Sequence, residues 1–217
     1  MRFLLLALCL AASPGFAQSA RSGTSEWSLN LLLDGSRSYD FEGGAALRID
    51  GGYGVGLTWA HHFSEHLALG SDATFGVFDY RARVAPGSGN AGAGFDALGT
   101  METATLRLHA TWHLLAQPVT PFLTAGAGVT IVDTNLGDTT PASGGCWVYP
   151  WYGTVCSVAP GHTLTRLSYG AALGMRFDLP RDQGFIRAMV GAEWIDVPDA
   201  MGSIGYGLMR VDFGVRF

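Results

Sequence analysis

The 217-residue chain contains no lysine, and all 13 of its basic residues are arginine, set against 18 aspartates and glutamates. Charged residues make up 14% of the chain, whereas soluble domains carry about 25%. This scarcity of charge argues against an ordinary soluble surface. A nucleic-acid partner is also disfavoured, because phosphate contacts need a basic face and the formal net charge is -5.

Long apolar runs are missing as well. The longest is Phe3 to Ala12, about half the 20 residues that a membrane-spanning helix needs. It follows Met1-Arg2 and precedes Ser-Pro-Gly-Phe-Ala at 13–17, so it reads as a secretory signal peptide cleaved after Ala17. We therefore expect a signal peptide at 1–17 and a single mature domain at 18–217.

Cysteine is scarce too, with three in the chain. Cleavage removes Cys9 and leaves Cys146 and Cys156. Because the chain is expected to be exported to an oxidising compartment, these two are predicted to form a disulfide.

Helical periodicity is absent, and what the sequence has instead is alternation with a period of two, the pattern of β-strands. The clearest example runs from Thr103 to Leu114, where leucine, alanine and tryptophan alternate with threonine, arginine and histidine. The runs that show this alternation lie at 26–33, 53–61, 67–78, 103–114, 122–132, 168–177, 186–194 and from about 206 to the end.

The connections between these eight runs alternate between short and long. The short ones lie at 62–66, 115–121 and 178–184, and the long ones at about 34–52, 79–102, 133–165 and 195–204. Long structureless loops are uncommon in soluble domains, but long extracellular loops and short periplasmic turns are typical of outer-membrane barrels. The pattern predicts four long loops at one end and three turns with both termini at the other.

Strand length points to the same architecture. Ten residues at about 3.3 Å each, tilted near 40°, cover roughly the 25 Å apolar band of such barrels. Lipid cannot satisfy an open sheet edge, so the strands must close into a ring. We predict an all-β fold, an eight-stranded antiparallel transmembrane β-barrel. A secreted sandwich with the same alternation is the alternative.

Three stretches resemble the small outer-membrane β-barrel proteins of the OmpW and OmpX kind: Tyr-Gly-Val-Gly-Leu at 53–57, Pro-Phe-Leu-Thr-Ala-Gly-Ala-Gly-Val at 121–129, and the final strand. The resemblance covers the mature chain and implies integral residence in a Gram-negative outer membrane, among outer-membrane lipid and lipopolysaccharide. It also implies that the last strand, with Phe213, Val215 and Phe217, is the signal read by the barrel-assembly machinery. The group includes passive, protective and transport proteins, so the resemblance does not select a function.

The polar faces of the runs should line the barrel interior, which in an eight-stranded barrel is just wide enough for side chains to fill. Burial makes unpaired charges costly, so we expect arginines and acids to pair across the lumen. The alternatives are a polar path for small solutes and a catalytic group. The expected inward residues are Asp72, Arg107, His109, His113, Arg176, Arg187, Glu193, Arg210, Asp212 and Arg216.

Two kinds of chemistry are predicted to be absent. A lipid-modifying enzyme would need a nucleophile and base facing the membrane, and the strand assignment places no Ser–His pair on the outward face. The histidines and glutamate in His61-His62-Phe63-Ser64-Glu65-His66 are of the types that bind Zn²⁺ or Cu²⁺, but a tight turn seldom brings three ligands together. We expect solvated turn residues, no metal and no cofactor.

The third long loop concentrates aromatic residues between the two cysteines. Trp147, Tyr149, Trp151 and Tyr152 lie there, and tryptophan and tyrosine are enriched at binding hot spots. The loop is therefore either a rigid aromatic knob that contacts a partner, or a self-packed loop that resists proteases.

The sequence thus favours a non-enzymatic outer-membrane barrel with a polar, plugged lumen, which serves envelope structure or surface contact and allows at most narrow passage of small or hydrophobic molecules. A porin-like channel for small solutes is the alternative, and a lipid-modifying enzyme is less favoured.

Overall fold

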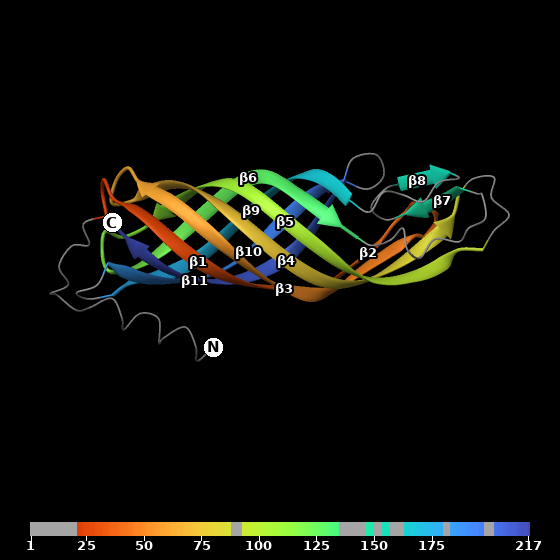
Figure 1. The fold of residues 1–217 in the computed structure, drawn as a ribbon, viewed down its shortest axis with the longest axis horizontal. Helices are drawn as coiled ribbons and strands as arrows, with labels where there is room; N and C mark the ends of the chain where they lie inside the picture. The colour runs from red at the N-terminus through yellow and green to blue at the C-terminus, as the bar shows by residue number, and fades with distance from the viewer. Residues whose placement is uncertain are drawn as a thin grey trace, which may run out of the picture.

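The computed structural model describes residues 21–87, 93–134, 146–149, 153–156, 163–179, 183–197 and 202–217, and the expected signal peptide lies outside them. Eight antiparallel strands form a closed ring, because β1 pairs with β3 on one side and with β11 on the other (Figure 1). This confirms the predicted fold. The ring consists of β1 (Ser25–Asp34), β3 (Ala46–His62), β4 (Leu67–Pro86), β5 (Phe95–His113), β6 (Val119–Asp133), β9 (Thr163–Asp178), β10 (Gly184–Val197) and β11 (Gly202–Arg216).

The ring closes down to Phe217. The Phe217 amide donates to the Ser25 carbonyl at 2.9 Å, and the Ser25 amide donates to the Phe217 carbonyl at 3.0 Å. The final aromatic residue is therefore part of the wall, which explains why the apolar and polar residues alternate up to Phe217.

Three short strands and a 3₁₀ turn lie at the opposite end from the start of β1 and the C-terminus (Figure 1). They are β2 (Arg37–Asp40), the turn Glu42–Gly44, β7 (Cys146–Tyr149) and β8 (Gly153–Cys156). We call this the hairpin end, after the β7–β8 hairpin, and the other the terminal end. Across the described ranges, no helix is long and apolar enough to cross a membrane.

The strands are longer at the hairpin end than the sequence predicted. The expected loop at 79–102 is mostly strand, since β4 continues to Pro86 and β5 begins at Phe95. The reason is a reversal of polarity along a continuous strand. On β4, Phe78, Tyr80 and Val84 are buried inside the ring, whereas the outward Arg81 and Arg83 are exposed.

The lumen therefore has two segments of opposite character. Towards the hairpin end lies an apolar segment, in which buried side chains pack as in a soluble core. Towards the terminal end lies a charged segment, surrounded by an outer wall of exposed leucine, valine and aromatic residues. The apolar segment is formed by Leu47, Ile49, Phe78, Tyr80, Ala82, Val84, Ala97, Met101, Val132, Trp147, Tyr149, Ile195, Ile204 and Tyr206.

Candidate functional site: a charge ladder in the lumen

The charged segment is organised as a continuous ladder of alternating cations and anions. Strand alternation points every second side chain inward, and the ring places side chains from distant strands within bonding distance. Five arginines and five acids take part, so the ladder is electrically balanced. In order from the terminal end they are Arg21, Asp178, Arg176, Glu26, Arg187, Asp212, Arg210, Asp72, Arg107 and Glu193.

The centre of the ladder is formed by two shared carboxylates. Asp212 accepts from Arg210 at 2.6 Å and pairs with Arg187 at 2.9 Å. Asp72 accepts from Arg210 at 2.7 Å and receives a two-pronged contact from Arg107 at 3.0 and 3.1 Å. Bidentate arginine–carboxylate geometry is the strong form of this interaction, so the centre is held rigidly.

At the terminal end of the ladder every charged side chain also has an oppositely charged partner, although Nη2 of Arg176 has no hydrogen-bond partner among the described residues. Glu26 accepts from Arg176 at 2.7 Å and from Arg187 at 3.0 Å. Arg176 also bonds Asp178 at 2.7 Å, and Arg21 lies 3.3 Å from the same carboxylate. Arg21, which precedes the first strand, is fully buried. Burial lowers the pKa of its guanidinium, and the neighbouring Asp178 partly opposes that effect.

Sequence reasoning missed three members of the ladder. Glu26 could have been found, because the outward positions Trp27 and Leu29 place it inward by alternation. Asp178 could also have been found, because it ends β9 and alternates with the outward Phe177, but it was assigned to a turn. Arg21 could not, since it lies before the alternating run.

The inward glycines make room for the arginines. A Cβ added to Gly126 would lie 2.9 Å from the Cβ of His109 and 3.1 Å from the Cδ of Arg107. The nearest atom, the backbone carbonyl oxygen of Leu108, would lie only 2.5 Å away. A larger residue at Gly126 would therefore clash with the neighbouring strand as well as with Arg107.

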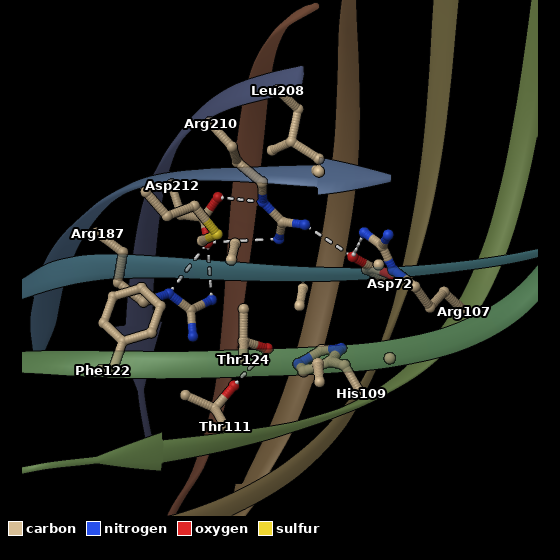
Figure 2. Close-up of a pocket in the computed structure, with 17 residues that line it drawn as sticks. Asp72, Arg107, His109, Thr111, Phe122, Thr124, Arg187, Leu208, Arg210 and Asp212 are labelled. Atoms are coloured by element: carbon tan, nitrogen blue, oxygen red, sulfur yellow. Dashed lines mark hydrogen bonds and ion pairs between the residues drawn. The ribbon is translucent and has the colours of Figure 1, made fainter. Parts of the chain in front are cut away.

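One cavity of about 40 Å³ lies beside the centre of the ladder. Figure 2 shows Asp72 of β4, Arg107 and His109 of β5, Arg187 of β10 and Arg210 of β11 around it. A cavity needs about 10–15 Å³ of such volume per water molecule, so this one has room for a few small molecules or ions of that size. The cavity is not part of a continuous channel, because Phe122, Arg210 and Asp212, which line it, are themselves buried.

The lumen histidines sit beside the ladder rather than in it. His109 lines the cavity, and its Nδ1 is buried without a partner among the described residues. His113 is fully buried, 5.4 Å from His62 between ring centroids. The Nε2 of His62 lies 3.0 Å from Glu26. Arg216 is the remaining residue that was expected in the lumen, and its side chain is half-buried.

The histidines of the 61–66 cluster point in different directions. His62 faces the lumen, the Nδ1 of His66 bonds the carbonyl of His113 at 2.7 Å, and His61 faces outward. The described residues include no group of three metal-ligating side chains.

One expectation about the outer wall is wrong. The Oγ of Ser25 lies 3.0 Å from the Nδ1 of His61, and both residues alternate with Glu26 and His62, whose side chains are in the lumen. A Ser–His pair therefore lies on the outward face. The prediction missed it because Ser25 precedes the first counted run and joins His61 only through the β1–β3 register.

The loop aromatics are divided. Trp147 and Tyr149 are buried in the apolar segment, so these two residues fit the self-packed alternative and not the exposed knob. Burial raises the pKa of the Tyr149 hydroxyl. Trp151 and Tyr152 lie outside the described residues. Cys146 is disulfide-bonded, and the β7–β8 ladder places Cys156 directly opposite it.

The expected assembly residues Phe213, Val215 and Phe217 all face outward on the last strand, near the terminal end. They continue the exposed apolar wall to the edge of the ring.

Comparison with known proteins identifies similar folds among solved structures. No family model matches the chain, and no curated protein is similar to it in sequence. Among solved structures, the outer membrane protein OprG from Pseudomonas aeruginosa aligns with a TM-score of 0.53 and 14% identity over 92% of this chain and 98% of that chain.

Two further structures align over 90% of this chain. Neisserial surface protein A aligns over 96% of its own length with a TM-score of 0.49 and 13% identity. The attachment invasion locus protein Ail of Yersinia pestis aligns over 99% of its length with a TM-score of 0.45 and 17% identity. The chain thus has the fold of a small eight-stranded outer-membrane barrel.

Proposed function

We propose that this protein is an integral outer-membrane barrel with a closed lumen and a non-enzymatic role in envelope structure or surface contact. The exposed apolar wall supports membrane insertion. On β4 it extends from Leu69 to Val77, which covers roughly 20 Å when the strand is tilted near 40°, close to the roughly 25 Å height of an outer-membrane apolar band.

The exposed apolar wall also supports a proposal for which end of the barrel faces the periplasm. Outward Trp27, Trp59, Trp112 and Phe213 are exposed towards the terminal end, as in an interfacial aromatic girdle. Charged outward residues such as Arg81 and Arg83 begin where the wall stops. In this orientation the terminal end faces the periplasm, and the apolar segment lies beyond the outer surface, among lipopolysaccharide headgroups.

The observation that carries the closed lumen is the complete pairing of the ladder. Each of its five arginines contacts at least one of its five acids, and the apolar segment fills the ring beyond them. An ion crossing such a lumen would have to break buried pairs and then enter an apolar core. Both steps are costly.

The test is single-channel conductance of the refolded protein in a planar bilayer. We expect no discrete steps from the native protein. An Asp72→Ser/Arg210→Ser variant removes one charge of each sign and enlarges the cavity but leaves the apolar segment in place, so it should show no steps either. Steady steps from the native protein, altered by Arg107→Ala, would replace this proposal with the transport channel.

The Ser25–His61 pair does not carry an enzymatic function. Within the described part of the chain no carboxylate bonds His61 to orient it, and the Ser25 amide donates to the Phe217 carbonyl instead of forming an oxyanion hole. An orienting third group and an oxyanion hole are the usual features of an activated serine. Unchanged lipid composition of vesicles carrying the protein is the expected result.

The last strand supports a further part of the proposal, recognition by the barrel-assembly machinery. Phe213, Val215 and Phe217 are exposed on one edge of the finished wall. Replacing Phe217 by Ala should reduce the folded fraction in cells, while refolding of the purified chain into detergent stays similar.

A further inference from the structure

The cavity beside the ladder has a built lining of buried charge. Arg187 and Arg210 are at least nine-tenths buried, as are Asp72 and Asp212. Each guanidinium has five N–H donors, and Arg187 directs Nε and Nη2 to Asp212, Nη2 also to Ser28, and Nη1 to Glu26. One Nη1 N–H of Arg187, which lines the cavity, therefore has no partner in the described residues.

His109 supplies the unusual element of this lining. It contributes an imidazole whose Nδ1 is buried and has no hydrogen-bond partner in the described ranges. Strands β6 and β9 add only uncharged residues, Thr124, Gly126 and Gly170 among them. The charged groups facing His109 are Asp72 on β4, Arg107 on its own strand β5, Arg187 on β10, and Arg210 and Asp212 on β11.

The charge balance of the ladder makes a proton on His109 consequential. With equal numbers of cations and anions, the neutral imidazole leaves the ladder balanced. A protonated imidazole adds one positive charge beside three guanidiniums in a low-dielectric interior, where an uncompensated charge is very unfavourable. Compensation needs one negative charge, and none of the paired carboxylates can supply it without leaving an arginine unpaired.

We propose that the cavity binds a small monovalent inorganic anion, of the size of chloride, together with a proton on His109. The volume of about 40 Å³ admits an ion slightly larger than a water molecule. The Nδ1–H of the imidazolium and the remaining N–H groups of Arg187 and Arg210 are its donors. The proton and the anion enter as a neutral pair, so the ladder keeps its balance.

Bromide is the probe, because its anomalous X-ray scattering identifies it by element. The full-length mature protein is refolded and crystallised in sodium bromide at about pH 5 and about pH 8, on either side of the ordinary histidine range. We expect an anomalous peak in the cavity at the lower pH and none at the higher. His109→Asn, which cannot take up a proton, should show none at either pH.

A solution measurement extends the test. At about pH 5, exchanging gluconate for bromide should raise the thermal midpoint of the native barrel and leave that of His109→Asn unchanged. His61→Asn, on the outer wall, is the matched control and should respond like the native protein. A cavity empty of bromide at the lower pH overturns the proposal, as does equal occupancy in the His109 variant. Neither result depends on whether the lumen conducts.

Discussion

The two segments of the lumen solve the same packing problem with opposite chemistry. They share strands, inward positions and a continuous hydrogen-bonded wall. In the charged segment, Arg210 and Asp72 are buried beneath an apolar exterior. In the apolar segment, Phe78 and Tyr80 are buried beneath Arg81 and Arg83.

The difference teaches which constraint acts on each segment. The apolar core needs only matching shapes, because dispersion and burial are non-directional. The ladder needs a partner for every charge, since one missing acid leaves an arginine buried alone. The charged segment should therefore be the less tolerant of single substitutions, although pairs of charges there contribute little net stability.

The largest effect is expected from removing a shared carboxylate. Asp212→Ala leaves Arg187 and Arg210 each short of a buried partner, which should lower the free energy of unfolding by about 3–5 kcal/mol. Urea unfolding in lipid vesicles measures it. Asp212→Asn keeps the shape and an acceptor oxygen, so its loss should be smaller. A loss below about 1 kcal/mol for the alanine variant would show that the ladder tolerates imbalance.

A matched pair of leucines tests where the exterior changes. Leu98 and Leu106 lie on the same face of β5 and are 65% and 64% exposed. Arginine should destabilise the barrel by about 2–4 kcal/mol at Leu106, if it lies near the bilayer midplane, and by about zero at Leu98. The same vesicle unfolding assay compares them. Equal losses would contradict the proposed membrane boundary.

The hairpin should respond locally. Cys146→Ser opens a ring of about eleven residues and should reduce hairpin stability by about 2–3 kcal/mol in the chain-entropy model. The readout is amide hydrogen exchange at Trp147 and Tyr149, which should become faster by one to two powers of ten, about 1.4 kcal/mol each. Strand β5 serves as the internal control, and faster exchange there as well would mean that the hairpin supports the whole ring.

The smallest effect is expected on the exterior of the apolar segment. Arg48 bonds Asp50 at 2.6 Å, but its side chain is largely exposed. Because water screens such pairs, Arg48→Ala should change the free energy of unfolding by less than about 1 kcal/mol. Urea titration of both proteins in one lipid decides it, and a loss as large as that of Asp212→Ala would erase the contrast between exposed and buried pairs.

Period two was enough to predict the ring, its eight strands and the inward direction of residues such as Arg107 and Arg187. The prediction was wrong where the apolar face of a strand is not its outward face. The reading took the apolar face as the outer one, so the reversal at Phe78 was interpreted as a loop. The burial of Trp147 and Tyr149 was also beyond it, since a hairpin folded over the ring end follows no strand period.

The sequence could not predict which charged residues of the ladder pair with each other. Alternation says that Glu26 and Arg176 both point inward, but not that they meet, because they are 150 positions apart in the chain. Their contact depends on the register and closure of the ring. A sequence can thus identify the members of a lumen network before it can identify its bonds.

The junction between Ser25 and Phe217 has a kinetic consequence. Every other pairing in the ring joins strands that follow one another along the wall, so hairpins can form from local contacts as the chain arrives. The β1–β11 ladder alone joins the two ends of the domain. Until the last strand docks, both edges are open and their amides and carbonyls face lipid. We therefore expect the β1–β11 pairing to form last, and substitutions in the final strand to change the rate at which the barrel closes.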